Sequence, residues 1–137
     1  MTTFRTILVL LAVIGTVDAQ AQHDWLEEIP GQYVGHLVEG LNEEPVLTIL
    51  RKTIDLQSNR AVLSGEYTDR AKPISGRLEG FSALRLRLLR CTWTDQFGQG
   101  PLELEFDETL TSFEGRWGSD ARSGVWFPWN GRITPRT

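Results

Sequence analysis

The chain has 137 residues, a formal net charge of −4 at pH 7 and one cysteine, Cys91. This mildly acidic balance argues against nucleic acid or an anionic membrane surface as a partner, since both attract basic proteins. A single cysteine excludes an internal disulfide, so packing must stabilise the one domain that this length allows. Cys91 alternates in phase with Leu89 and Trp93, which predicts a buried, inert thiol; the alternative is a bridge between two molecules.

The first 21 residues are predicted to be a signal peptide. Arg5 supplies a positive charge, and residues 7–14 form an apolar run that is too short to span a bilayer. Cleavage is expected before Gln22, and cleavage before Gln20 is the alternative. The apolar run could instead be a buried strand or an uncleaved anchor. We therefore expect an exported protein, periplasmic or extracellular, with one domain over residues 22–137 and no membrane-spanning segment after cleavage.

The expected domain begins with a short helical segment and continues with strands. Trp25, Leu26 and Ile29 have the spacing of one helical turn, and we expect this turn to cap one end of the strand structure. From Gly31 onward, apolar residues recur at every second position, which is the period of a strand with one buried face. The expected strands are residues 33–38, 46–55, 61–67, 74–78, 83–94, 102–107, 113–117 and 125–133.

The clearest pair of strands lies in residues 101–118. Apolar and charged residues alternate on both sides of a turn at residues 108–111, which predicts a hairpin whose apolar side chains share one face. The predicted cross-strand pairs are Phe106–Phe113, Leu104–Gly115 and Leu102–Trp117. A shift of one residue would destroy this match, because every side chain on one strand would change face.

Residues 83–94 are expected to form one long strand. Leucines alternate with arginines up to Leu88, but Leu89 shifts the alternation by one residue, so we predict a β-bulge at that point. The following turn would place Arg90 opposite Glu105. Exposed charge pairs contribute only about 0.2–1 kcal/mol each, and we interpret the arginines as a solvated outer face rather than an anion site.

Eight short strands joined mostly by short turns predict an all-β fold, an antiparallel up-and-down barrel. Closure into a barrel removes the exposed edges that an open sheet would leave. The aromatic-rich residues 125–133 are expected to close the sheet against the first strand.

Glycine recurs beside a large residue on the same face of several expected strands. The examples are Gly31-Gln32-Tyr33, Gly65-Glu66-Tyr67, Gly76-Arg77-Leu78 and Gly115-Arg116-Trp117. Glycine inside a strand is unfavourable by roughly 0.5–1 kcal/mol relative to alanine, so its recurrence needs a reason. We interpret the pattern as steric: the backbone coils tightly at glycine, and an aromatic ring from a neighbouring strand covers the gap.

These segments together resemble a group of small exported bacterial domains. The matching segments are Leu63-Ser64-Gly65-Glu66-Tyr67, Ser75-Gly76-Arg77-Leu78, Cys91-Thr92-Trp93, Gly100-Pro101-Leu102-Glu103-Leu104 and Phe113-Glu114-Gly115-Arg116-Trp117-Gly118. Over about residues 31–133 the chain is similar to Gly/Trp-rich, lipocalin-like or avidin-like β-barrels, many of unknown function. Two features depart from that pattern: the strand at residues 83–94 is longer and richer in arginine, and an avidin-type set of polar ligand-binding residues is missing. Biotin binding is therefore not expected.

Few residues offer catalytic chemistry. His23 and His36 are the only histidines, neither has a partner at a zinc-like spacing, and His36 is expected to point outward. The acidic pairs Glu27-Glu28 and Glu43-Glu44 are interpreted as solvated surface. Because no nucleophile or phosphate-loop motif occurs, we expect neither enzymatic activity nor a cofactor or metal ion.

The aromatic residues favour a binding function instead. The candidate ligand-binding residues are Tyr67, Trp93, Trp117, Trp126 and Trp129. They are expected at the mouth of the barrel, where a small apolar molecule or a segment of a partner protein would bind. The alternative is that these side chains only fill the interior, since an eight-stranded barrel is just wide enough to be filled. The alternative function is an interaction protein, such as a periplasmic protease inhibitor or an envelope factor, that acts through its loops.

Overall fold

The computed structural model describes residues 25–133. The predicted signal peptide, its cleavage site and His23 lie outside the described residues. Among the residues that are described, no helix is long and apolar enough to span a membrane.

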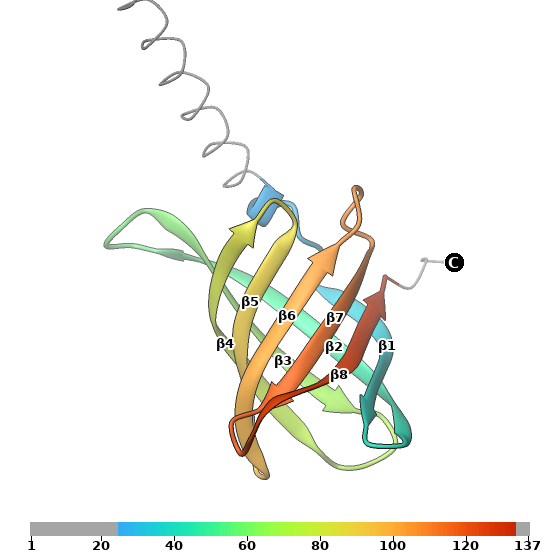
Figure 1. Cartoon of the computed structure of the whole chain (residues 1–137). Helices are drawn as coiled ribbons and strands as arrows, with labels where there is room; N and C mark the ends of the chain where they lie inside the picture. Colours follow the sequence, from blue (N-terminus) through green and yellow to red (C-terminus); the bar gives the residue numbers. More distant parts are fainter. Residues whose placement is uncertain (1–24, 134–137) are drawn as a thin grey trace, which may run out of the picture.

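Eight antiparallel strands form a closed barrel in which every strand pairs with its neighbours in the sequence (Figure 1). The strands are β1 (Gln32–Glu39), β2 (Asn42–Asp55), β3 (Arg60–Asp69), β4 (Ser75–Arg85), β5 (Leu88–Asp95), β6 (Gly98–Phe106), β7 (Ser112–Ser119) and β8 (Arg122–Arg132). The predicted fold class, an up-and-down barrel of eight strands, is confirmed.

The last strand closes the barrel against the first, as the sequence predicts. Val34 of β1 opposes Arg132 of β8, and Leu37 opposes Trp129. Beside these pairs, the backbone N–H of His36 donates a hydrogen bond to Oδ1 of Asn130, with 3.0 Å between the two atoms. The edges of the sheet are thereby joined, which removes the unpaired edge that an open sheet would present.

The hairpin of β6 and β7 has the predicted register. Phe106 opposes Phe113, Leu104 opposes Gly115, and Leu102 opposes Trp117. Leu102, Leu104 and Phe113 are fully buried, so the apolar face of this hairpin forms part of the core. Cys91 on β5 is also buried, and its thiol is free, as predicted.

The prediction of one long strand over residues 83–94 is wrong. Residues 83–85 belong to β4, the chain turns at Leu86 and Arg87, and β5 begins at Leu88. Arg87 adopts a φ of 63° in this turn. The shift in alternation at Leu89 therefore follows a hairpin turn and does not lie within one continuous strand. The register of β4 against β5 shifts near Gly80 and again between Ala83 and Arg85, which oppose Leu89 and Leu88.

The charge pairs on the outer face also differ from the predicted ones. Arg90 opposes Glu103, whereas Leu88 opposes Glu105. The carboxylate of Glu105 instead accepts a hydrogen bond from Arg85 at 2.9 Å, because the turn brings the end of β4 alongside it. These side chains are exposed, as the sequence predicts for the outer face.

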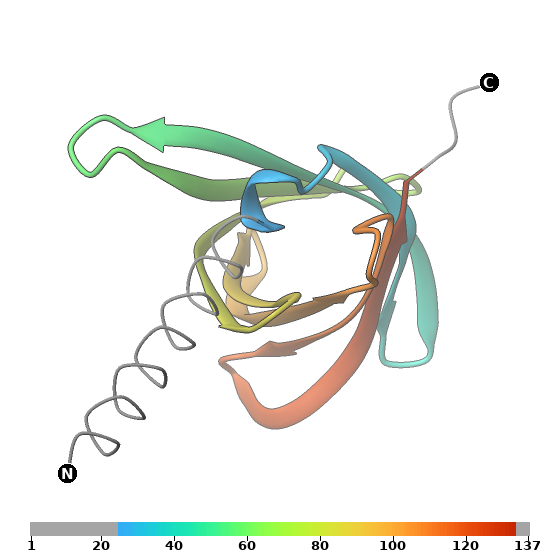
Figure 2. The ribbon, with the colours of Figure 1, turned by 90° about the horizontal axis from the view of Figure 1, so that it is seen from above.

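One end of the barrel is closed by the short helical turn at residues 25–27 (Figure 2). Trp25 and Ile29 are buried there. The Trp25 ring lies 6.1 Å from that of Phe106, and Phe106 lies 5.7 Å from Tyr33, centroid to centroid. This confirms the predicted cap and makes one end of the interior a packed aromatic core.

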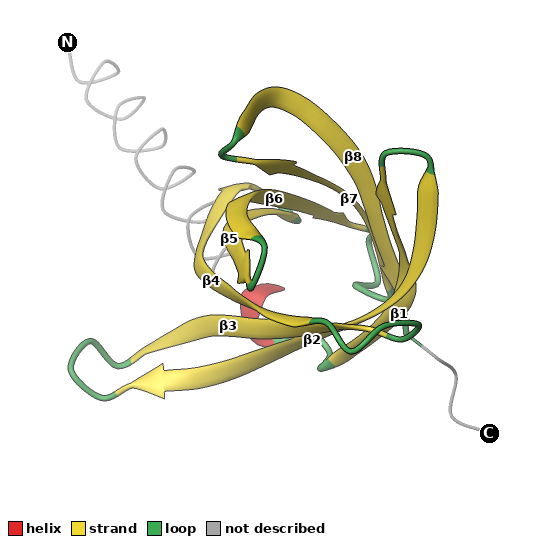
Figure 3. Cartoon of the chain, turned by 90° about the horizontal axis from the view of Figure 1, so that it is seen from below, coloured by secondary structure: helices red, strands yellow, loops and turns green. Residues whose placement is uncertain are grey.

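The hairpin of β2 and β3 extends beyond the barrel as an arm, which we define as residues 51–64 (Figure 3). β1 pairs with β2 only as far as Ile49, and β4 pairs with β3 only from Gly65 onward. Within the arm, Ile54 is 67 % exposed and Leu56 is 94 % exposed. Alternation predicts strands here, but it does not show that the strands leave the barrel.

Candidate ligand-binding cavity at the open end of the barrel

The end of the barrel opposite the helical turn contains a cavity of about 600 Å³, which we call the mouth cavity. It is formed where β1, β3, β5 and β7 end and the following strands begin. The aromatic residues that line it are Tyr67, Trp93, Phe97, Trp117, Phe127 and Trp129. The charged residues that line it are Glu39, Glu44, Asp69, Lys72, Asp95 and Arg122.

Strand direction and alternation place the aromatic residues at this end. Tyr67, Trp93 and Trp117 each lie two residues before the last residue of β3, β5 and β7, respectively. These three strands all run toward the open end, and the residue two before the last keeps the inward direction of the core positions. Together with Trp129 of β8, these three residues form what we call the aromatic floor of the cavity: Tyr67, Trp93, Trp117 and Trp129.

The aromatic floor is held by ring contacts between strands. Tyr67 and Trp129 meet edge to face with centroids 4.9 Å apart, and Trp93 meets Trp117 in the same way at 5.6 Å. Trp117 also contacts Phe127 at 5.3 Å. Edge-to-face pairs are the favoured aromatic arrangement, since the positive ring edge meets the negative face of its neighbour. These contacts hold the rings of the aromatic floor in place.

The indole N–H groups of the floor are all used inside the protein. Trp93 donates to the carbonyl oxygen of Gly118 at 2.7 Å. Trp117 donates to the carbonyl of Val38 at 2.9 Å, and Trp129 donates to the hydroxyl of Thr48 at 3.0 Å. The three tryptophans thus offer ring surface to a bound molecule but no free hydrogen-bond donor.

Tyr67 and Asp95 form a hydrogen-bonded pair at the wall of the cavity. The Tyr67 hydroxyl donates to Oδ2 of Asp95 at 2.5 Å, and the backbone N–H of Phe97 donates to Oδ1 at 2.8 Å. Burial raises the pKa of Tyr67 well above its ordinary value, and the hydrogen bond to Asp95 and the charge of its carboxylate raise it further. Tyr67 therefore keeps its proton and remains a donor to Asp95.

A second polar cluster lies at the rim and contains Glu44, Asp69 and Lys72. The Lys72 ammonium forms an ion pair with Glu44. Asp69 accepts hydrogen bonds from the backbone N–H groups of Ala71 and Lys72 at 2.8 and 3.2 Å. Burial raises the pKa of Asp69, but its contact with the Glu44 carboxyl group, the two backbone N–H donors and the charge of Lys72 together lower it below its ordinary value.

The prediction that Glu43 and Glu44 are both solvated surface is wrong for Glu44. β2 begins at Asn42, four residues earlier than predicted, so Glu44 shares the inward face of Val46. Glu44 is buried and lines the mouth cavity, whereas Glu43 is exposed. If the alternation of the predicted strand is continued two residues back from Val46, it places Glu44 on the inward face.

The structure brings together four of the five predicted ligand-binding residues: Tyr67, Trp93, Trp117 and Trp129 all line the mouth cavity. Trp126 lies apart from them on the outer face, where the Arg116 guanidinium is 4.1 Å from its ring centroid. Asp69, Asp95, Phe97 and Phe127 also line the cavity, although none of them was predicted from the sequence to do so. Asp69 and Asp95 carry a recognisable signal, because each follows an inward aromatic residue by two positions.

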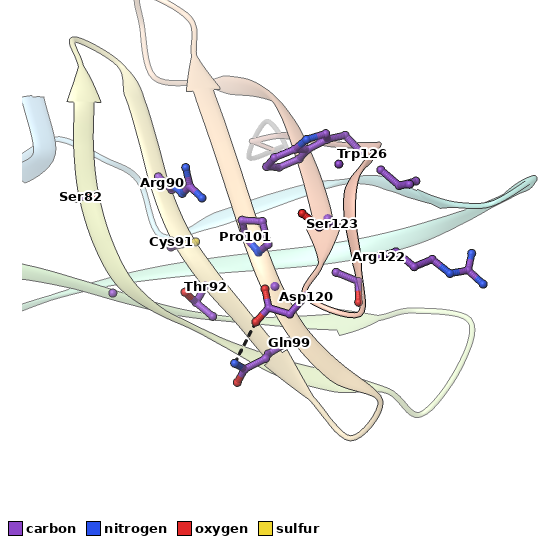
Figure 4. Close-up of a pocket in the computed structure, with 16 residues that line it drawn as sticks. Ser82, Arg90, Cys91, Thr92, Gln99, Pro101, Asp120, Arg122, Ser123 and Trp126 are labelled. Carbon is purple, nitrogen blue, oxygen red and sulfur yellow. Dashed lines mark hydrogen bonds between the residues drawn. The ribbon is translucent and has the colours of Figure 1, made fainter.

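Trp126 instead lines an outer groove of about 580 Å³ between the β7–β8 hairpin and the outer faces of β5 and β6 (Figure 4). Arg90 and Pro101 form part of its base, and Gln99 donates a hydrogen bond to Asp120 at 3.2 Å. The groove is polar and its only aromatic lining residue is Trp126. It lacks the aromatic floor that distinguishes the mouth cavity.

Within residues 25–133, no cluster of three or more His, Cys, Asp or Glu side chains is arranged to hold a metal ion. His36 points outward, as predicted, and its Nδ1 lies 3.7 Å from the carboxylate of Glu43. Comparisons of the chain with protein-family models, with curated proteins and with solved structures found no match.

Proposed function

We propose that the protein is an exported, non-enzymatic binding module that holds one small, largely apolar molecule in the mouth cavity. The observation that carries the proposal is a cavity of about 600 Å³ above an aromatic floor. Sites of roughly 300–1,000 Å³ with mostly apolar walls are typical of small-molecule binding. Export is supported by the signal-peptide features of residues 1–21.

The arrangement of the interior supports binding at one end only. Trp25, Tyr33, Phe106 and Phe113 are buried and pack ring against ring at the closed end. Eight-stranded barrels can either be filled by side chains or hold one small ligand. This barrel combines both: the closed half is filled, and the open half has room for a molecule.

Tryptophan fluorescence provides the first test. Three of the five tryptophans, Trp93, Trp117 and Trp129, line the mouth cavity. A panel of small apolar molecules should therefore contain compounds that change the emission in a saturable way. If no compound changes the emission or raises the melting temperature, the proposal is wrong, because a ligand that binds the folded state must stabilise it.

A matched pair of variants tests the location. Val125 lines the mouth cavity and is 43 % exposed, whereas Val62 lies on the arm and is 44 % exposed. Val125→Trp should weaken ligand binding measured by calorimetry at least tenfold, because the larger side chain occupies the cavity. Val62→Trp should leave the affinity unchanged. Equal effects of the two substitutions would place the ligand elsewhere. Val125 also borders the outer groove, so Trp126→Ala serves as a further control there: it should leave the affinity unchanged, and a loss of affinity would place the ligand in that groove.

A second candidate function is favoured by the arm. Leu56 is 94 % exposed and Ile54 is 67 % exposed at the end of a projecting hairpin, a surface suited to a protein partner. The protein would then act as an interaction protein, such as a protease inhibitor or an envelope factor. Inhibition of a protease that Leu56→Asp abolishes would support this function, and absence of inhibition across the main protease classes would count against an inhibitor.

A further inference from the structure

The aromatic floor of the mouth cavity has no free hydrogen-bond donor among its tryptophans and Tyr67. The Trp93, Trp117 and Trp129 N–H groups are bonded within the barrel, and the Tyr67 hydroxyl donates to Asp95. What these side chains can offer a ligand is the face or the edge of an aromatic ring. The face carries the negative part of the ring quadrupole and attracts cations. A carboxylate or phosphate placed on these rings would find no donor from them.

The charged residues that line the cavity are mostly acidic. They comprise four carboxylates, Glu39, Glu44, Asp69 and Asp95, and two cations, Lys72 and Arg122. Lys72 is already paired with Glu44. A cavity with an excess of one charge and low-dielectric walls concentrates ions of the opposite sign.

Asp95 lies next to the aromatic floor and has no cationic partner among the described residues. Its two oxygens accept hydrogen bonds only from the Tyr67 hydroxyl and the Phe97 backbone N–H, which are both neutral donors. These bonds fix the position of the carboxylate without cancelling its charge. Each carboxylate oxygen can accept more than one hydrogen bond, so Asp95 can also contact a ligand.

We propose that the molecule bound in the mouth cavity carries a cationic group, an ammonium or quaternary ammonium, on an apolar body. The cation lies against the aromatic floor and is balanced by Asp95. This inference rests on the proposed function and specifies its ligand class. Ring faces and one carboxylate with a free charge are the features by which proteins recognise such cations.

A set of three probes with the same apolar body tests the charge. The probes are phenylbutyl-trimethylammonium, its neutral isostere with a carbon in place of the nitrogen, and phenylbutyl sulfonate. The cation should bind at least about tenfold more tightly than the isostere, and the sulfonate should bind most weakly. Added salt should weaken binding of the cation and leave the isostere unchanged, because only the charged probe gains from Asp95.

Two variants, each of which removes one negative charge, test whether Asp95 is the carboxylate that attracts the cation. Asp95→Asn keeps an acceptor for Tyr67 but removes the charge, and it should bring the cation to within about threefold of the isostere while the isostere itself binds as before. Asp120→Asn makes the same change in the outer groove, where Gln99 contacts the carboxylate, and should leave the tenfold preference intact.

The possible results separate the two proposals. Equal binding of the cation and the isostere would overturn the cation inference while leaving a binding module in place. Tighter binding of the sulfonate would also overturn it and would assign the charged contact to Arg122 at the rim. Failure of all three probes to bind at millimolar concentration would overturn the cation inference, and failure of the wider apolar panel as well would remove the proposed function.

Discussion

Gly115 lies where β7 passes close to the backbone of both of its neighbours, β6 and β8. A Cβ atom at this position would lie 2.6 Å from the carbonyl oxygen of Glu103 and 2.8 Å from that of Trp129. These neighbours are backbone atoms, which cannot move away without breaking the ladders that hold them. Gly115→Val should therefore lower the free energy of unfolding by more than about 1 kcal/mol, measured by urea denaturation.

Gly31→Val is the matched control, because the nearest atom to a Cβ at Gly31 is 3.8 Å away. The control should change the free energy of unfolding by less than about 0.5 kcal/mol. Equal midpoints for the Gly115 and Gly31 variants would contradict the close packing of β7 between β6 and β8.

The Cys91 thiol is buried, and burial raises its pKa to about 12. Since the thiolate is the reactive form, alkylation at pH 8 should be slow in the folded protein and rapid in denaturant, as followed by mass spectrometry. Above about pH 9 the unfolded chain loses the proton that the folded protein keeps, so stability should fall as pH rises toward 12. Rapid alkylation of the folded protein would show that Cys91 is accessible.

Alternation predicted the inward direction of Tyr67, Trp93, Trp117 and Trp129, since side-chain direction follows from the period of a strand. It could not predict the cavity, because the size of an unfilled space depends on how residues from all strands meet. Asp95 illustrates the difference. Its position is a consequence of alternation, but its contact with Tyr67 depends on the pairing of β3 through β4 to β5.

The helical turn at residues 25–27 covers the closed end of the barrel. Trp25 is only 6 % exposed, and its N–H has no partner among the described residues. Trp25→Ala should cost about 3 kcal/mol or more in thermal unfolding, because a large buried ring is lost. Trp25→Phe should cost less than half as much, because it keeps a ring against Phe106 and removes a buried donor without a partner. Similar costs for the two variants would show that ring packing is not what Trp25 contributes.

The arm should be dispensable for the stability of the barrel. Its residues pair only with each other, and Ile54 and Leu56 contribute exposed surface rather than core. Replacing residues 53–62 with an Asn-Gly turn joins Lys52 to Leu63, which already oppose each other. The melting temperature should stay within about 3 °C of the original. A larger fall would mean that the arm contributes contacts to the barrel.

The boundary between β4 and β5 shows where sequence patterns mislead at the scale of an element. Leu84 and Leu86 alternate with arginines like a buried strand face, yet both are exposed near the tip of a hairpin. The turn at Arg87 uses a positive φ without a glycine, so it carries no turn signal in the sequence. The β6–β7 hairpin was predictable because its polar loop separates two unambiguous alternating segments.

For the whole molecule, the decisive step is closure of the barrel between β1 and β8. Along this seam Val34 opposes Arg132 and Leu37 opposes Trp129. The hydrogen bond from the His36 N–H to Asn130 adds a further link at 3.0 Å. If the seam opens, it exposes two strand edges and the aromatic interior together, so opening should be coupled to global unfolding.

Gly35 lets β1 and β8 approach closely, and a substitution at Gly35 tests how much this seam contributes to stability. A Cβ atom at Gly35 would lie 2.1 Å from the carbonyl oxygen of Asn130, so Gly35→Ala must push β8 away from β1. The variant should lose at least about 2 kcal/mol of stability, with circular dichroism and tryptophan fluorescence changing at the same urea concentration. Asn130→Ala removes only one hydrogen bond and should cost about 1 kcal/mol. His36→Ala leaves the backbone N–H in place and should be neutral. If Gly35→Ala were no worse than His36→Ala, the seam would not limit the stability of the barrel, and the packed closed end would have to hold it alone.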